Sequence, residues 1–541
     1  MTLPRLPIPA LNETAERYLT WVRPLLNDDD FSHTQQVVKN FVMHEGKQLQ
    51  QDLRQFADQQ ACHDKSWLSD AWLDSYLNVR KSLPLSTSGA FRLDLDLPDN
   101  GLMRLAYLLV GMAKQSADYL SGQIAPNISP RGEMLDMRQW LSLRGIGRIP
   151  QPHTDGYEIA PMAKQARYII VFWQGQAYSI PILDADYRLY SVTTVKNLLE
   201  SITQDKPAAD NMAVLSLAPA EQAVELYNEL SEVVDNKHNF QLLAHSLFHV
   251  HLSPAAFADD ADALRELTFL ANEKLWAYKP MTICANVENN SYFVHLEHSS
   301  YDAGALQAMF ARGEATAQDL ASEQSPDFST KTAELGKLHW QLNDRQRQAL
   351  ADLQQTHHEK AKNYQVSITT LDIDTKLIPE RTSMDFLMQL PMQYAQLKTF
   401  GRIRNTYEAV DVSHFMAGRT ECVRPVSSES VAFIRALSAG NADITGFNNA
   451  HQEHKNRIKA CKRGHGVNRH LLGLQLMAQQ RGIEPEIFND KGYIALTNDF
   501  LSTSSLGDRR WIGDFAFTPT PLFTQGLHEG VQRLMAVFKN T

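Results

Sequence analysis

The chain has 541 residues, a length that favours two domains or two large lobes over a single hydrophobic core. Hydrophobic residues make up 43% of the chain and charged residues 21%, which is typical of soluble globular proteins. The formal net charge of −10, without a basic tail or a Lys/Arg-rich block, argues against a nucleic-acid partner.

Cysteine usage and apolar runs bear on the compartment. The four cysteines form no CxxC pair and are too few for a disulfide framework, so we expect a reducing compartment. No apolar h-region opens the chain, and the longest apolar run, 105–113, is far shorter than the ~18 residues that span a bilayer. We therefore expect a monomeric cytosolic protein without a membrane span.

The pattern of elements predicts two α/β lobes. Residues 11–80 read as helices, and strand-like runs such as "ARYIIVFW" and "PMTICANV" then alternate with helical stretches such as "PAEQAVELYNELSEVV". From Leu335 the order repeats, with a helix, a strand "YQVSITTLDI" and a second helix. We predict a helical segment over 1–85, an N-terminal lobe over 86–334 and a C-terminal lobe over 335–541.

A histidine marks the end of one predicted strand. In "SYFVHLEHSS", His298 shares a face with Val294 and Leu296 at the last position before a turn of small residues. A buried neutral imidazole there is well placed as a general base, although a lone histidine on an apolar face is more often a core residue. Asp302, four residues later, either orients the site or caps the next helix.

The stretch "EHSSYDAG" resembles the active-site signature of the CoA-dependent acyltransferases. The resemblance to the carnitine/choline acyltransferases extends, in family order, through "LPRLPIPALNETAERYL", "NTYEAVDVSHFMAGRTECVRP", "GHGVNRHLLGLQLMAQQRG" and "NDFLSTSS". It implies an α/β fold of two chloramphenicol-acetyltransferase-like lobes, each a mixed sheet flanked by helices, with an active-site tunnel between them. It also implies reversible acyl transfer between CoA and carnitine, with catalysis by His298, assisted by Asp302.

The same resemblance assigns further residues. It implies that Ser504 stabilises the tetrahedral oxyanion. Arg469 is expected to bind the carnitine carboxylate and to interact with Asp302. The set that the resemblance places around the acceptor is Tyr407, Thr420, Arg469, Ser502, Thr503, Trp72 and Tyr76. Because choline has no carboxylate, the trio of Tyr407, Thr420 and Arg469 favours carnitine over choline.

The CoA side departs from the family pattern. Lys376 and Asp385 match family positions that bind CoA, whereas a second lysine is missing and Arg381 takes its place. After Ser504 the family's Asp-Gly-Tyr-Gly motif is absent and the C-terminus is shortened, with "TQGLHEGVQRLMAVF" as the expected last helix. These departures leave open an acyl carrier protein as donor, another alcohol or amine as acceptor, or a non-catalytic homologue.

Other chemistries have less support. The chain has no Gly-x-Ser-x-Gly elbow and no P-loop. His249 and His251 in "FHVHLS" share a strand face and would supply two metal ligands without a third, so half-exposed strand histidines are the preferred interpretation. We expect no metal and no tightly bound cofactor, with acyl-CoA as a substrate.

Overall fold

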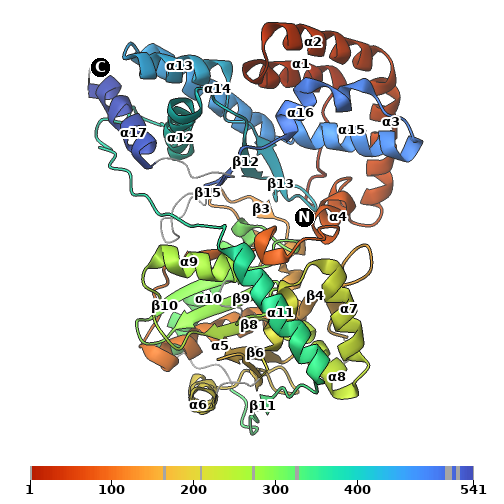
Figure 1. The fold of residues 1–541 in the computed structure, drawn as a ribbon, viewed down its shortest axis with the longest axis vertical. Coiled ribbons are helices and arrows are strands. Elements are labelled where there is room, and N and C mark those ends of the chain that lie inside the picture. The colour runs from red at the N-terminus through yellow and green to blue at the C-terminus, as the bar shows by residue number, and fades with distance from the viewer. Residues whose placement is uncertain are drawn as a thin grey trace.

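Two lobes lie one above the other in the molecule (Figure 1). The computed structural model describes residues 3–161, 166–206, 210–270, 274–322, 328–505, 515–518 and 524–539. The lower lobe in this view, here the N-lobe, comes from the middle of the chain, and the upper C-lobe combines the two ends. Within the described ranges, every helix is too short or too polar to cross a membrane.

A seven-stranded mixed sheet forms the centre of the N-lobe. In spatial order its strands are β1 (Gly89–Leu93), β10 (Ser291–Leu296), β9 (Met281–Asn286), β8 (His249–Leu252), β6 (Tyr168–Trp173), β7 (Gln176–Pro181) and β11 (Gly336–Lys337). The β9–β8 and β8–β6 pairs are parallel, and the other pairs are antiparallel. Beside it lie two hairpins, one of β2 (Asn127–Ile128) with β3 (Met134–Leu135) and one of β4 (Ile146–Ile149) with β5 (Gly156–Ile159).

Helices cover both faces of this sheet, so its strands are buried on both sides. One face packs on α5 (Gly101–Leu120), α6 (Val192–Thr203) and α10 (Ala303–Ala321). The other packs on α7 (Ala220–Ser231), α8 (Val234–His245), α9 (Asp260–Phe269) and α11 (Asp344–Ala361). Alternate residues of one strand divide between the two cores: Val171 faces the first, while Ile170 and Phe172 face the second.

The C-lobe has a smaller mixed sheet. Its strands, in spatial order, are β13 (Thr420–Val423), β12 (Thr406–Asp411), β14 (Leu501–Ser504) and β15 (Phe515–Phe517), with β12 and β14 parallel. Its helices are α12 (Met384–Phe400), α13 (Ser428–Ala439), α14 (Ile444–Lys462), α15 (Asn468–Arg481), α16 (Lys491–Thr497) and α17 (Thr524–Lys539). The predicted last helix is α17, and the segments 506–514 and 519–523 before it lie outside the described residues.

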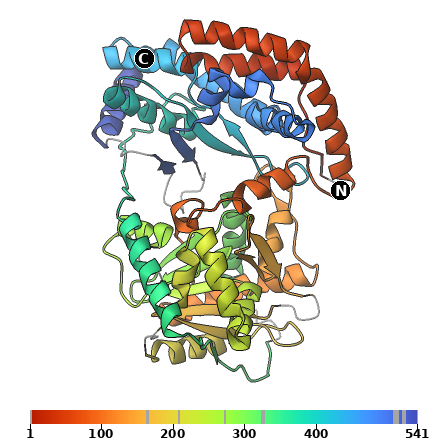
Figure 2. The same cartoon turned by 45° about the vertical axis from the view of Figure 1, so that its right-hand side comes forward.

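The N-terminal helices complete the C-lobe. These are α1 (Leu11–Val22), α2 (Asp28–Met43), α3 (Glu45–Ala61) and α4 (Ser69–Leu77). Tyr18 and Leu53 share one buried cluster with Leu474 of α15 and Leu496 of α16. Both ribbon views show the red N-terminal helices against the blue C-terminal ones (Figures 1 and 2). A Cβ on Gly473 would lie 2.9 Å from a Leu53 methyl carbon, so α3 and α15 pack closely there.

Two features differ from the sequence-based expectations. The helix α11 lies beyond the predicted boundary at residue 334, yet Leu350 and Leu353 pack in the N-lobe core, so this lobe reaches to about Ala361. The run 364–373, predicted as a strand, has no sheet partner among the residues that the structure describes. Leu371 and Ile373 instead pack loosely on the C-lobe core, and the run belongs to the linker that joins the two lobes.

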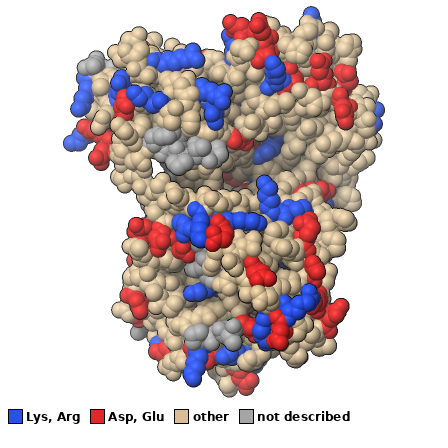
Figure 3. Space-filling model, in the orientation of Figure 1, with Lys and Arg blue, Asp and Glu red and all other residues tan. Residues whose placement is uncertain are grey.

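Short 3-10 segments join several of these elements, at Arg23–Leu25, Leu83–Leu85, Arg138–Arg144, Met212–Leu217 and Glu486–Asn489. Lys and Arg are interspersed with Asp and Glu over the face shown in Figure 3, and the surface is hollowed where the two lobes meet. The side chains that the resemblance singles out lie mostly along this junction, on both sides of it, as the following contacts show.

Candidate active site

His298 lies in a turn directly after β10, two residues past the last strand position. It is half-buried, and its Nδ1 is 2.8 Å from the carbonyl oxygen of Tyr301. Because a carbonyl oxygen can only accept, Nδ1 carries the proton in this arrangement and the neutral ring leaves Nε2 as the acceptor. This tautomer is the one that a general base requires at Nε2.

Asp302 occupies the N-cap position of α10 but does not cap the helix with its side chain. Its carboxylate is held by Arg419, with distances of 2.7 Å to Nε and 3.0 Å to Nη2. Burial alone would raise the pKa of Asp302, but the charge and hydrogen bonds of Arg419, together with the charges of His298 and Arg469, hold that pKa below its ordinary value. Of the two alternatives drawn from the sequence, the structure therefore favours the electrostatic one.

Arg419 is the functional candidate that sequence reasoning missed. Arg469 was expected to interact with Asp302 and does so through its charge, but the direct ion pair of Asp302 is with Arg419, from the Gly-Arg-Thr-Glu stretch. Arg419 also donates to the carbonyl oxygens of Ser299 at 3.1 Å and His298 at 3.4 Å. A C-lobe side chain thus holds the N-lobe turn that carries His298. Its place next to Thr420 in the motif was the available signal.

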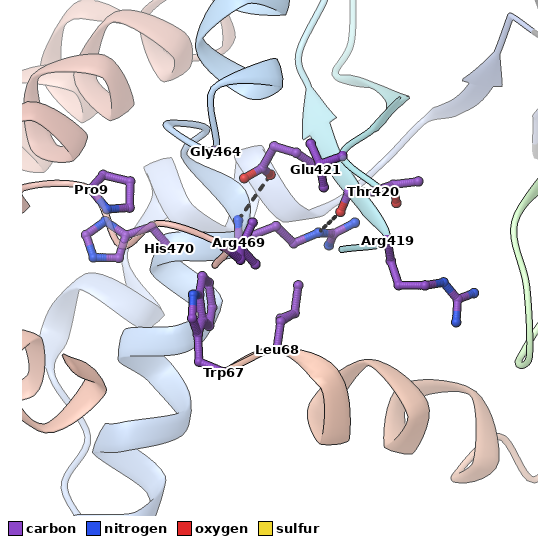
Figure 4. A pocket seen from close by; sticks show the side chains of 11 residues that line it. Pro9, Trp67, Leu68, Arg419, Thr420, Glu421, Gly464, Arg469 and His470 are labelled. Atoms are coloured by element: carbon purple, nitrogen blue, oxygen red, sulfur yellow. Dashed lines mark hydrogen bonds between the residues drawn. The ribbon is translucent and has the colours of Figure 1, made fainter. Parts of the chain in front are cut away.

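Tyr407, Thr420 and Arg469, which the resemblance assigns to the acceptor carboxylate, contact one another. Arg469, in the first turn of α15, donates from Nη2 to the Tyr407 hydroxyl at 3.1 Å and from Nε to the Thr420 carbonyl at 2.9 Å. The Thr420 hydroxyl also hydrogen bonds to Tyr407. Glu421 accepts the backbone N–H of Arg469 at 3.3 Å, which fixes the start of α15 (Figure 4).

The electrostatics around Arg469 are those of a cation that lacks an ionic partner. Among the described residues, no carboxylate forms an ion pair with its guanidinium, whose contacts are to neutral oxygen atoms. Burial would lower the pKa of Arg469, but Tyr407 and Glu421 raise it. Burial in turn raises the pKa of Glu421, despite the nearby Arg469. A guanidinium whose hydrogen bonds go to neutral oxygen atoms can still take a carboxylate as a direct partner.

Two aromatic side chains of α4 connect the acceptor cluster with His298. The Arg469 and Arg419 guanidinium carbons lie 4.4 Å and 5.4 Å from the centre of the Trp72 ring. The Tyr76 ring lies 6.2 Å from Trp72 and 5.3 Å from the His298 ring, centre to centre. Burial raises the pKa of Tyr76, so its hydroxyl stays protonated at neutral pH. Trp72 therefore packs against both guanidinium groups, and Tyr76 packs against the His298 imidazole.

The Ser-Thr-Ser stretch is β14, and its residues alternate between two environments. Ser502 is paired with Tyr407 on β12, so the two share one face of the sheet, together with Ser504 two residues on. Thr503 lies on the opposite face, 1% exposed, where its hydroxyl contacts Glu408 and accepts from Gln389 at 2.9 Å. The expected place of Thr503 beside the acceptor therefore does not follow from this geometry, which favours a supporting position.

The residues expected on the CoA side are not gathered into one cluster. Lys376 and Arg381 are exposed in the linker before α12, and Arg381 has a left-handed backbone with φ of 61°. Asp385, in the first turn of α12, is 2.7 Å from His454 Nε2 on α14. The three positions thus lie on one segment, with only Asp385 tied to the folded core.

His249 and His251, the candidates for metal binding, are fully buried rather than half-exposed. His249 Nε2 contacts the Leu243 carbonyl at 3.1 Å, and burial lowers the pKa of both imidazoles, to about 4 for His251. Within the described ranges, no group of three or more His, Cys, Asp or Glu side chains forms a metal site. Both histidines therefore stay neutral in the N-lobe core.

The fold and site define an α/β enzyme with a histidine between two lobes, and comparison with known proteins identifies its family. The family model for choline/carnitine O-acyltransferases matches residues 6–526, so the chain belongs to that family. The chain is 28% identical to mitochondrial carnitine O-palmitoyltransferase 2 of Xenopus tropicalis and 27% identical to the human protein of that name. It is 24% identical to carnitine O-acetyltransferase of Columba livia.

These alignments cover 93% of this chain and 83% of each relative. The predicted two-lobed α/β fold and the enzyme class, an O-acyltransferase, are thereby confirmed. The acceptor, the donor and the roles of single residues are finer questions.

Proposed function

We propose that this enzyme is a carnitine O-acyltransferase, which transfers an acyl group reversibly between CoA and the carnitine hydroxyl with His298 as the general base. The observation that carries the proposal is the half-buried guanidinium of Arg469, which has neutral contacts to Tyr407 and Thr420 and no described ion-pair partner. A carboxylate is the ligand that completes such a set, through charge-assisted hydrogen bonds. Carnitine has a carboxylate and choline has none.

The proposed reaction uses the tautomer described for His298. With Nδ1 donating to the Tyr301 carbonyl, Nε2 accepts the proton of the carnitine hydroxyl as its oxygen attacks the thioester carbon of acyl-CoA. The C–O bond forms as the carbonyl becomes an oxyanion, for which the Ser504 hydroxyl is the proposed donor. The oxyanion then collapses, the C–S bond breaks, and the imidazolium returns the proton to the CoA sulfur.

Asp302 assists without touching the imidazole in this scheme. Its carboxylate and His298 attract each other electrostatically, which favours the imidazolium that forms in the transition state. Because Arg419 binds the same carboxylate at two atoms and also binds the His298 carbonyl, the charge and the ring stay in fixed relation. Asp302 and Arg419 are therefore proposed to orient the base.

The test follows CoA thiol release from acetyl-, octanoyl- and palmitoyl-CoA, with carnitine or choline as acceptor. Wild-type enzyme should turn over with carnitine and not with choline, and His298→Ala should lower kcat by at least about 100-fold while leaving the fold intact. Equal rates with the two acceptors would reject the role of the acceptor carboxylate. Wild-type turnover in His298→Ala would reject the proposed base.

An acyl carrier protein is a second candidate donor. The observation that favours it is the CoA segment, where Lys376 and Arg381 are both exposed and Asp385 is engaged with His454. A donor carried on a protein arm depends less on a phosphate site in this segment. Comparing octanoyl-CoA with octanoyl acyl carrier protein at equal concentration distinguishes the two, since the preferred donor has the higher kcat/KM.

We also propose that the enzyme is monomeric and cytosolic. All four cysteines are unpaired thiols, three of them buried, which fits a reducing compartment. Light scattering of the purified protein tests the first point, and cell fractionation tests the second.

A further inference from the structure

A buried arginine lies behind the turn that carries His298. Arg148 is on β4, 1% exposed, and its guanidinium reaches three separate segments of the chain. Nε donates to the Asp155 carboxylate at 2.9 Å, Nη1 to the Glu297 carboxylate at 2.9 Å, and Nη2 to the Tyr76 carbonyl at 3.0 Å. Burial would lower the pKa of Arg148, but the two carboxylates outweigh burial and raise it.

One of these contacts holds Tyr76, whose ring packs beside His298. Tyr76 is in the last turn of α4, where carbonyl groups have no partner within the helix and where a cation is favoured by the helix dipole. Arg148 satisfies the Tyr76 carbonyl, and the Asp155 backbone N–H satisfies that of Leu77 at 3.1 Å. The Tyr76 ring is the one that packs at 5.3 Å from the His298 ring.

Another of these contacts holds the turn that carries His298. Glu297 and Ser299 are the residues immediately before and after His298, and both are fully buried. The Ser299 hydroxyl donates to Glu297 Oε2, and Tyr157 contacts the same hydroxyl from β5. Arg148 anchors the Glu297 carboxylate at its other oxygen. The two neighbours of His298 are thus bonded to each other and to one guanidinium.

We propose that Arg148 is a positioning residue for His298, holding the base through Glu297 on one side and through Tyr76 on the other. The proposal rests on His298 being the base. Without Arg148, both the turn that carries His298 and the residue Tyr76 beside it lose a hydrogen-bond partner. The imidazole then loses its orientation toward the acceptor hydroxyl. A misplacement of about 1 Å at a reacting group is enough to lower turnover about 100-fold.

Because Arg148 and Glu297 are charged, changing either one should shift the pH dependence of catalysis, whereas a change that only loosens the structure should not. Several charged or titratable groups face this region. They are Glu297, Asp302 and Tyr301 on the turn, Arg148, Asp155, Arg80, Tyr157 and Tyr278 of the N-lobe, Tyr76 of α4, and Arg419, Arg469 and Tyr407 of the C-lobe. Arg148→Met leaves Glu297 without its guanidinium, which favours protonated His298. Glu297→Gln removes that negative charge and disfavours it.

The experiment measures kcat, both KM values and the pH dependence of kcat/KM for Arg148→Met and Glu297→Gln. We expect Arg148→Met to lower kcat about 10- to 100-fold with both KM values within about threefold of wild type. The acid limb of the kcat/KM profile should shift to higher pH by about 0.5–1 unit in Arg148→Met. In Glu297→Gln it should shift to lower pH by a similar amount. Glu297→Gln keeps the side chain's size and supplies the test if Arg148→Met does not fold.

Arg104→Met is the control, because Arg104 is another N-lobe arginine, half-buried, which binds the Leu95 and Leu97 carbonyls near the far end of β10. Arg104→Met should lower the melting temperature and leave the pH dependence of kcat/KM as in wild type. Acid limbs that coincide with wild type in both test variants, in an enzyme that His298→Ala inactivates, would overturn the positioning role. Full activity of His298→Ala would instead reject the proposed base and leave the contacts of Arg148 structural.

Discussion

The Asp302 carboxylate meets the Arg419 guanidinium across the junction of the two lobes, at two atoms and with both side chains largely buried. A pair in this setting costs more to break than an exposed one, because either partner left alone is an uncompensated charge out of water. The same guanidinium binds the carbonyl of His298. The stability of the junction between the lobes and the orientation of His298 therefore both depend on the Asp302–Arg419 ion pair.

We expect Asp302→Asn to lower the free energy of unfolding by about 3 kcal/mol at pH 7. Because the folded-state pKa of Asp302 is depressed, its contribution is present above the unfolded-state pKa near ~4 and is lost as the pH falls through the lower folded value. Denaturant titrations at several pH values should give a constant difference from wild type above about pH 5, narrowing below about pH 4. A difference that grew on acidification would contradict this sign.

Arg419→Gln provides the control for that measurement. If the two side chains act as a pair, the double variant with Asp302→Asn should lose much less stability than the sum of the single variants, with a coupling of about 1–3 kcal/mol. Strict additivity would mean that each side chain acts alone.

For Arg469→Asn we expect the KM for carnitine to rise about 100-fold or more, because a charge-assisted contact to the carboxylate is lost. The KM for acyl-CoA should change little. Tyr407→Phe, which removes only the hydroxyl that Arg469 contacts, should raise the carnitine KM by about tenfold at most. Equal changes in the two KM values would count against a carboxylate at this site.

Sequence motifs predicted the trio of Tyr407, Thr420 and Arg469 because each residue lies inside a distinctive string. They placed Arg469 near Asp302, and the charge of Arg469 does help to lower the pKa of Asp302. They did not predict that the direct ion pair is with Arg419, because only three-dimensional packing decides which of the two arginines reaches the carboxylate. Arg419 reaches Asp302, whereas Arg469 is turned toward Tyr407. Arg148 carried no signal in a single sequence, because two of its three partners, Glu297 and Tyr76, come from segments far from it in the chain.

At the scale of elements, β14 separates two kinds of side chain by simple alternation. Ser502 and Ser504 share a face with Tyr407, while Thr503 faces the buried pair of Glu408 and Gln389. The strand period of two is enough to explain this, once one residue of the strand is placed.

A matched pair of variants tests the alternation. Ser504→Ala should lower kcat about 10²- to 10³-fold, the usual effect of removing an oxyanion donor, with little loss of stability. Thr503→Val should lower the free energy of unfolding by about 1–3 kcal/mol, because Glu408 and Gln389 lose a buried partner, and leave kcat near wild type. The reverse assignment of effects would place Thr503 on the reacting side.

Periodicity predicted the long helices and the central strands well, as in α7 and β9, because their burial patterns are regular. It failed for residues 364–373, whose β-branched residues are typical of a strand. An extended segment becomes a strand only when a neighbouring strand pairs with it, and no described segment pairs with this linker. The side chains of Leu371 and Ile373 find a core to pack on without one.

For the whole molecule, the two ends of the chain share one core. Leu53→Ala should open a cavity where α3 meets Gly473 of α15 and destabilise the C-lobe by about 2–5 kcal/mol. Hydrogen exchange should then accelerate in α3 and α15 together, and much less in α5 or α10. Leu109→Ala, at a fully buried N-lobe position on α5, is the control and should show the opposite pattern. Acceleration confined to α3 would mean that the segments are energetically independent.

The shared core also has a consequence for biosynthesis. Tyr18 and Leu496 belong to one buried cluster but are separated by almost the whole chain. At about 5–20 residues per second, the ribosome makes the second tens of seconds after the first. During that interval the nascent helices α1–α3 expose the apolar faces that α15 and α16 will cover. The N-lobe can close while translation continues, whereas the C-lobe is completed only near its end, and newly made helices at the amino end are natural clients for a holding chaperone.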